Sequence, residues 1–176
     1  HRLLSPNYSA PLSLSQSNVV RQAMKILVTA GTTPFNSLFA HLDNLTYKFP
    51  DMEFIGQIGN GDYAPETFPS FRFTNEFPHQ IESSDAVITH AGAGTVYDLL
   101  ERGKRSIVVA NLERQDKHQL EITRYLNDSG YALATTELDS LEALLHRLKG
   151  FKPRPYQKID FFLGDEIYQN LLTALR

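Results

Sequence analysis

Short apolar runs alternate along the chain with stretches in which apolar residues recur every three or four positions. Six of the runs are typical of buried strands, at residues 26–28, 54–58, 71–73, 86–89, 106–110 and 131–134. The helical spacing predicts six helices, over residues 35–45, 78–84, 95–101, 117–126, 137–148 and 165–175. Alternation of this kind predicts an α/β fold, a Rossmann-like parallel sheet of about six strands with helices on both faces.

The two ends of the chain differ from the part between them. Residues 24–150 carry the alternating pattern and are predicted to form one domain. Residues 1–23 are rich in Ser, Asn, Gln and Pro and lack the apolar stretch of a secretory signal. They are either a cloned or linker-derived tail or a native extension that docks on another surface. Residues 151–176 are a proline-punctuated connector and a final helix, whose apolar face either packs on its own sheet or docks on a partner.

Composition removes several classes of function. The 176 residues contain no Cys, which excludes disulfides, thiolate metal sites and a cysteine nucleophile. The net charge is −3 and there is no basic run, so nucleic acid is not an expected partner. No apolar stretch approaches the roughly 20 residues that a membrane-spanning helix requires, so no direct membrane span is expected.

Neither of the two commonest nucleotide motifs is present. The loop after the first predicted strand, Ala-Gly-Thr-Thr-Pro at 30–34, has one glycine where a dinucleotide site has G-x-G-x-x-G. The second predicted strand ends in Gln-Ile-Gly at 57–59, with no carboxylate for a ribose. Lys104 follows Gly103 but lacks the upstream glycine and the Ser or Thr of a P-loop. NAD binding and P-loop chemistry are therefore not expected.

A second glycine-rich loop follows the fourth predicted strand and has the sequence H-A-G-A-G-T-V-Y-D at 90–98. Small residues let a phosphate approach the backbone, and the N–H groups at the start of a helix favour negative charge. His90 can donate to a phosphate oxygen, and Asp98, about one turn into the helix, can accept from two ribose hydroxyls. Alternatively, the glycines only allow close packing of helix and strand, and Asp98 only complements the helix dipole.

These motifs resemble a known family. The pattern H-x-G-x-x-[ST]-x-x-[DE] is similar to the nucleotide-diphosphate segment in the carboxyl half of GT-B glycosyltransferases. The segments ITHAGAGTVYDLLERGK, VVAN and DKHQLE, in this order, resemble the glycosyltransferase family 28 C-terminal domain. The opening VTAGTTPF is similar to one branch of it, the detached donor-binding subunits of two-component UDP-sugar transferases. The resemblance covers residues 24–148.

The resemblance implies a fold and a set of binding residues. The fold would be the C-terminal half of a GT-B glycosyltransferase. Asp98 would bind the ribose, Phe77 and Pro78 the uracil, and His118 and Gln119 the sugar, although His118 is also explained as a surface helix residue. The donor diphosphate would be bound by Gly31, Thr32, Thr33, His90, Gly92, Ala93, Gly94 and Thr95.

The resemblance also implies an activity and a partner. The chain would be the donor-binding subunit of a glycosyltransferase that transfers a hexose or N-acetylhexosamine from a UDP-sugar to a lipid-diphosphate-linked saccharide, in exopolysaccharide or glycolipid synthesis. No catalytic residue is identified in this chain; the base is expected in a membrane-anchored acceptor-binding subunit that recruits the chain from the cytoplasm to the cytosolic face of a membrane. No cofactor and no metal are expected. A non-catalytic UDP-sugar-binding module and half of a GT-B-type sugar-nucleotide epimerase remain as alternatives.

Several polar residues have a simpler structural interpretation. Thr33, followed by Pro34, is typical of a helix N-cap as well as of an anion contact. Asp116 is interpreted as the N-cap of the helix that carries His118. Glu137 and Asp139 precede a helix and are interpreted as capping and dipole partners of that helix.

Overall fold

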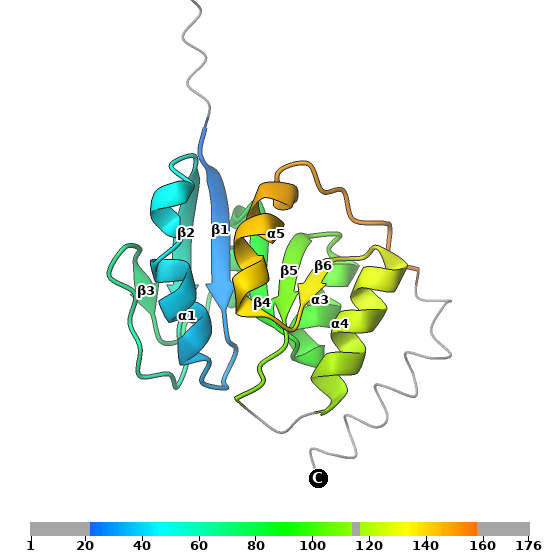
Figure 1. The fold of residues 1–176 in the computed structure, drawn as a ribbon, viewed down its shortest axis with the longest axis horizontal. Helices are drawn as coiled ribbons and strands as arrows, with labels where there is room; N and C mark the ends of the chain where they lie inside the picture. Colours follow the sequence, from blue (N-terminus) through cyan, green and yellow to red (C-terminus); the bar gives the residue numbers. More distant parts are fainter. Residues whose placement is uncertain (1–21, 114–116, 158–176) are drawn as a thin grey trace, which may run out of the picture.

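Six parallel strands form one sheet in the order β3-β2-β1-β4-β5-β6 (Figure 1). The protein is seen as a computed structural model that describes residues 22–113 and 117–157. The chain runs outward from β1 to β3 and then returns to the other side of β1, so the strand order reverses between β1 and β4. The parallel six-stranded sheet predicted from the sequence is confirmed.

The elements follow the predicted alternation closely. The strands are β1 Met24–Thr29, β2 Met52–Gln57, β3 Ser70–Phe71, β4 Ala86–His90, β5 Arg105–Val109 and β6 Leu133–Thr135. The α-helices are α1 Asn36–Asp43, α2 Phe77–Ser83, α3 Ala93–Glu101, α4 Lys117–Ser129 and α5 Leu141–Leu148. Two short 3₁₀ helices, η1 Thr46–Lys48 and η2 Leu138–Ser140, precede β2 and α5.

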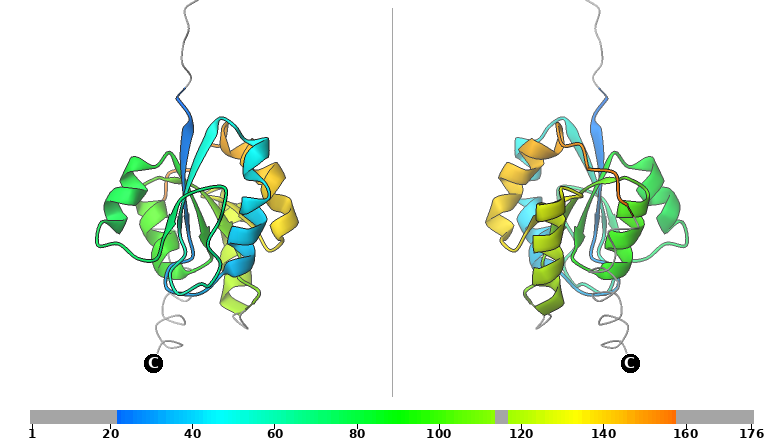
Figure 2. Two further views of the ribbon diagram at one scale, coloured as in Figure 1. Left: turned by 90° about the vertical axis from the view of Figure 1, so that its left-hand side faces the viewer. Right: turned by 90° about the vertical axis from the view of Figure 1, so that its right-hand side faces the viewer.

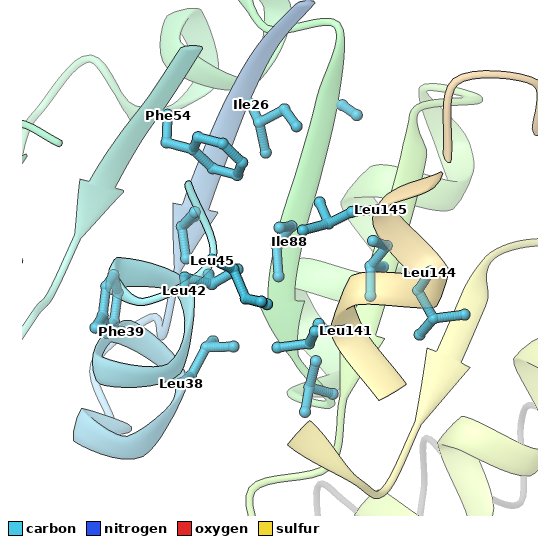
Figure 3. Packing of buried hydrophobic residues seen from close by; sticks show 14 of the residues in the cluster. Ile26, Leu38, Phe39, Leu42, Leu45, Phe54, Ile88, Leu141, Leu144 and Leu145 are labelled. Carbon is cyan, nitrogen blue, oxygen red and sulfur yellow. The ribbon is translucent and has the colours of Figure 1, made fainter. Parts of the chain in front are cut away.

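Helices cover both faces of the sheet (Figure 2). Side chains of a strand point alternately to the two faces, so β1 contributes to both halves of the core. Ile26 and Val28 pack with α1 and α5 in a cluster that includes Phe39 and Leu145 (Figure 3). Leu27 points to the opposite face and packs with residues of α2, β4 and α3. Both faces of the strands are therefore buried, which explains why the strands read as continuous apolar runs.

Helix α4 is longer than predicted. Asn127, Asp128 and Ser129 look like a turn in the sequence, but the helix continues through them to Ser129. The Asn127 amide binds both backbone groups of Ala134, at 2.8 and 2.9 Å, and so docks the last turn on β6. The residue after the helix is Gly130, whose φ of 71° is in the left-handed region that favours glycine.

Two predicted helix starts also differ. Thr33 is not the N-cap of α1, because the helix begins at Asn36 with Phe35 before it and no side-chain capping bond. Pro34 stays outside the helix, and its carbonyl accepts a hydrogen bond from a different loop. Glu137 is at the N-cap position of η2 without a side-chain capping bond, and Asp139 lies in the first turn of that helix. Glu137 therefore does not cap the helix through its side chain, whereas Asp139 lies where a carboxylate can complement the helix dipole.

Asp116 and the final helix predicted over residues 165–175 lie outside the described residues. Of the predicted tail, only residues 22 and 23 are described. Of the connector, residues 151–157 are described and contain neither helix nor strand. Arg154 fastens this segment to the end of α4, since its backbone N–H donates to Gly130 O and its guanidinium to Ser129 O. Tyr156 then packs edge-on against Tyr131, with ring centroids 5.4 Å apart.

Asp43, at the end of α1, holds the loop that connects β2 to β3. Its carboxylate accepts hydrogen bonds from the Tyr63 hydroxyl and from the backbone N–H groups of Glu66 and Thr67, at 2.7–2.9 Å for the shortest bond of each. Desolvation opposes ionisation here, but these hydrogen bonds outweigh it and lower the Asp43 pKa from 3.8 to about 2. The carboxylate therefore stabilises the folded protein fully above the unfolded-state pKa.

We expect Asp43→Ala to reduce the free energy of unfolding at neutral pH by about 1.5–3 kcal/mol, the usual contribution of hydrogen bonds to a charged group. The difference from the wild type should shrink as the pH falls from about 5 to about 2, because the wild-type carboxylate becomes protonated. Urea denaturation at several pH values measures both effects. Glu53→Ala, which removes an exposed carboxylate, is the control. A loss that stayed constant with pH would contradict the role of the ionised group.

Candidate functional site

The loops after β1 and β4 lie at the carboxyl edge of the sheet, on the two sides of the strand-order reversal. In open α/β sheets this position forms a crevice that binds ligands. Lys104 lies at the opposite edge, just before β5, and donates to the Ser84 and Glu82 carbonyls at 2.7 and 3.3 Å. Burial lowers the pKa of this amine. Lys104 therefore caps the end of α2 rather than lying in the crevice.

Helix α3 starts at this edge of the sheet, directly after the glycine loop that follows β4. Its first internal hydrogen bond runs from Val96 N–H to Gly92 O at 3.0 Å, so the N–H groups of the three preceding residues point out of the helix end. Gly92 is the N-cap and makes no side-chain capping bond, and the first turn contains no acidic residue. The positive end of the helix dipole is thus not neutralised by the helix itself. It is suited to an anion.

His90 lies where the two glycine loops meet. A methyl group on Gly31 would be 3.0 Å from His90 Cε1, and one on Gly92 would overlap with His90 Nε2. The imidazole ring therefore packs between the two glycine backbones. This contact explains the glycine at 92, whose φ of −81° any residue could adopt. The sequence predicts both glycines and His90 as diphosphate residues, and the structure brings all three together.

The loop after β1 is held firmly, which limits what it can offer a ligand. Gly31 N–H donates to Thr29 Oγ1 at 3.1 Å and is therefore not available to a phosphate. Asn60, from the loop after β2, donates to Thr32 O at 2.9 Å. Thr29 Oγ1 in turn donates to Gln57 Oε1 at 2.9 Å. Gly31 thus contributes a close backbone approach rather than its N–H, and Thr32 and Thr33 remain the loop's candidate polar contacts.

Asp98 lies on the outward face of α3. The buried residues of this helix are Val96, Leu99 and Leu100, whereas Gly94 and Asp98 are on the other side and one turn apart. A methyl group on Gly94 would meet nothing within 4 Å, so this face is open. Asp98 Oδ1 accepts from Arg102 Nε at 2.7 Å, and the carboxylate side chain is 40% exposed. The arrangement leaves room for a ribose against α3, with Asp98 beside it.

The predicted uracil residues begin α2. Pro78 is at the first helical turn and exposed, and as a proline it has no N–H to donate to a base. Phe77 packs partly against the cluster of Leu27, Val87 and Leu99 on the same face of the sheet as α3. Figure 1 shows α2 and α3 behind the sheet, the side on which the glycine loop leads into α3. The assignment of Phe77 and Pro78 to the uracil therefore stays a prediction.

The predicted sugar residues differ from each other in their surroundings. His118, in the first turn of α4, is about one-third exposed, and its Nδ1 lies 3.6 Å from Glu121 Oε2. Gln119 is only 4% exposed, and its Oε1 accepts from the backbone N–H of Asn111 at 2.6 Å. Gln119 is therefore part of the internal framework of the site, because its side-chain oxygen already accepts a hydrogen bond. His118 is the more accessible of the two.

The sequence analysis did not identify the residues that connect the site loops to one another. Local sequence patterns do not show which side chains bond to the backbone of another loop. Asn111, directly after β5, donates from Nδ2 to Pro34 O at 3.0 Å. Arg72, after β3, donates to the carbonyls of Gly59 and Gly61 at 3.2 and 3.1 Å and so holds the loop that contacts Gly31. Asn111 ends the segment VVAN of the family resemblance, which gave it no role, and Arg72 was marked only by its position in the predicted strand at residues 71–73.

Several cavities lie away from the glycine loops, and one of about 370 Å³ lies between α4 and the end of β6. One of about 820 Å³ has a mainly apolar lining that includes Phe54, Phe68 and Tyr47, beside the amino-terminal half of β2. One of about 250 Å³ lies at the carboxyl edge and is lined by Leu112, Glu113 and the segment that starts η2. No group of three or more His, Asp and Glu side chains in residues 22–113 and 117–157 is placed to bind a metal. The residues that the sequence predicts for the donor diphosphate lie at the glycine loops and not in the cavity of about 820 Å³.

Comparisons with known proteins agree with this geometry. The model of the glycosyltransferase family 28 C-terminal domain matches residues 25–166. The chain is 33% identical over 127 residues to the human UDP-N-acetylglucosamine transferase subunit ALG13, which covers 63% of this chain and 11% of that protein. It is 26% identical over 160 residues to the subunit of the same name from Yarrowia lipolytica, covering 78% of this chain and 80% of that one.

The chain thus spans about a tenth of the length of the human relative but most of the yeast one. Among solved structures, that of Acinetobacter baumannii MurG superimposes with a TM-score of 0.60 and 20% identity, over 72% of this chain and 41% of that one. This likeness confirms the predicted fold, the C-terminal half of a GT-B glycosyltransferase.

Proposed function

The chain belongs to the glycosyltransferase family 28 C-terminal domains, and on that premise we propose that it is the donor-binding subunit of a two-component transferase. The observation that carries the proposal is the contact of the two glycine loops around His90, in front of the uncapped start of α3. A diphosphate placed there would accept from the N–H groups of Ala93, Gly94 and Thr95. Its ribose would then lie along α3 toward Asp98.

The proposed donor is a UDP-sugar that carries a hexose or N-acetylhexosamine. Two relatives are named UDP-N-acetylglucosamine transferase subunits, which favours UDP-N-acetylglucosamine as the first donor to test. In glycosyl transfer, negative charge develops on the leaving diphosphate in the transition state. Preorganised N–H donors at the α3 start would stabilise that charge without a metal. We therefore propose a metal-independent reaction with no cofactor.

The chain would supply half of the active site. The proposed other half is a membrane-anchored subunit that binds a lipid-diphosphate-linked saccharide and provides the base, so that the reaction takes place at the cytosolic face of a membrane. No helix in residues 22–113 and 117–157 is long and apolar enough to cross a bilayer. A role in exopolysaccharide or glycolipid synthesis follows from such an acceptor.

Calorimetry with UDP in the presence of EDTA tests the donor assignment. We expect binding that Mg²⁺ does not strengthen, and neither release of UDP from UDP-N-acetylglucosamine nor epimerisation of the sugar by the chain alone. Membranes that contain the chain with its partner should transfer sugar to the lipid-linked acceptor, whereas membranes with the partner alone should not. Epimerisation by the chain alone would instead identify an epimerase half, and UDP binding without partner-dependent transfer would identify a non-catalytic module.

A further inference from the structure

Asn111 is buried directly after β5, and both polar atoms of its side chain and its backbone N–H make hydrogen bonds. Its side chain donates from Nδ2 to Pro34 O at 3.0 Å and accepts at Oδ1 from Glu113 N–H at 3.1 Å. Its backbone N–H donates to Gln119 Oε1 at 2.6 Å. The residue is 1% exposed, so its amide cannot exchange these partners for water without opening the site.

These bonds join loops that are far apart in the sequence. Pro34 belongs to the loop after β1, 77 residues before Asn111. A second bond runs in parallel, from Ser37 N–H at the start of α1 to Glu113 Oε1 at 3.3 Å. The bond to Gln119 adds the start of α4 to the same unit. Asn111 is therefore the point at which the loop after β1, the loop after β5 and α4 meet.

We propose that Asn111 is a positioning residue that sets the separation between the diphosphate site and the sugar site. The inference rests on the proposed function, in which Thr32 and Thr33 face the diphosphate and His118 faces the sugar. Gln119 contributes to the same positioning, because its side-chain amide oxygen Oε1 accepts from Asn111 N–H rather than from a ligand. Asn111 thus acts through the two loops and contacts neither part of the donor.

The two loops do not depend on Asn111 equally. The loop after β1 keeps its own anchors, the bond from Gly31 N–H to Thr29 and the bond from Asn60 to Thr32 O. The loop after β5 is tied to the loop after β1 only by Asn111 and Glu113 among the bonds described. Loss of the Asn111 bond therefore displaces the sugar side of the site more than the diphosphate side.

The experiment compares Asn111→Asp with Asn127→Asp. The first substitution keeps the shape but replaces the donor to Pro34 O with a carboxylate oxygen. Asn127 is the matched control, because its amide also makes two backbone bonds, at 2.8 and 2.9 Å, but joins α4 to β6. Calorimetry gives the dissociation constants of UDP and UDP-N-acetylglucosamine for each protein, and thermal unfolding gives the loss of stability.

We expect Asn111→Asp to raise the ratio of the UDP-N-acetylglucosamine constant to the UDP constant about tenfold, the effect of one lost buried hydrogen bond. The UDP constant itself should change by less than about threefold, and Asn127→Asp should leave the ratio unchanged. Equal losses of affinity for both ligands, or the same ratio change in Asn127→Asp, would overturn the positioning role.

Should Asn111→Asp not fold, Glu113→Ala is the second variant, because it removes the parallel bond to Ser37 at an exposed position. We expect it to raise the ratio of the two dissociation constants by a smaller factor, and an unchanged ratio in this variant overturns the proposal. A wild type that binds neither ligand refutes the proposed function itself.

Discussion

Gly92→Ala is expected to weaken UDP binding by about 100-fold, the largest effect of any substitution considered for this site. The new methyl group would overlap with His90 Nε2, so the ring has to shift, and Gly31, on which a methyl group would be only 3.0 Å from His90 Cε1, leaves little room on that side. The imidazole must therefore leave the position between the loops. The anion site would lose the His90 contact and the close backbone approach at the α3 start at the same time.

Calorimetry with UDP measures the loss, and Gly150→Ala is the control. A methyl group on Gly150 would meet nothing within 4 Å, and this residue follows α5, far along the chain from both glycine loops. The control should bind UDP like the wild type. If Gly92→Ala remained folded and bound UDP with wild-type affinity, His90 and the two glycine loops would not form the diphosphate site.

Asp98→Ala is expected to weaken UDP binding by about 10- to 100-fold, which corresponds to 1.5–3 kcal/mol for hydrogen bonds to one charged group. The outward face of α3 offers this carboxylate to a ribose, and alanine leaves the ribose hydroxyls without an acceptor. Calorimetry with UDP and with 2′-deoxy-UDP separates this effect from a general loss of structure. The variant should discriminate less between the two nucleotides than the wild type does.

Arg102→Ala is the matched control for Asp98. It removes the ion pair with Asp98 Oδ1 but keeps the carboxylate. An exposed pair one helical turn apart contributes only about 0.3–0.5 kcal/mol, so the control should fold and bind UDP within about threefold of the wild type. Equal UDP affinity in Asp98→Ala and the wild type would refute the ribose assignment and leave the carboxylate a partner of Arg102 only.

The sheet and the main site loops were predictable because they depend on local patterns. Apolar runs mark strands that are buried on both faces, and the reversal at β1 and β4 places the loops after them at one crevice. The glycines around His90 follow from the need for close approach. The family resemblance added which ligand such a crevice would bind.

The parts that could not be predicted depend on side-chain bonds between different elements of the fold. Asn127 belongs to a turn by its local preferences, but its partner on β6 extends α4 through it. Gln119 carries the resemblance to a sugar-binding residue, yet its side chain is buried against Asn111. The role of Asn111 depends on Pro34, which is 77 positions away in the sequence and accepts a hydrogen bond from the Asn111 side chain in the fold. Only the folded chain brings these pairs together.

The central claim is that UDP binds at the crevice between β1 and β4. An amide ¹H–¹⁵N NMR titration of the chain with UDP tests it most directly, because every backbone N–H reports its own surroundings. The account predicts that the largest shifts occur at Gly31, Thr32, Gly92, Gly94 and Asp98, with and without Mg²⁺. Shifts confined to the apolar cavity beside β2, around Phe54 and Phe68, or no shifts at saturating UDP, would contradict it.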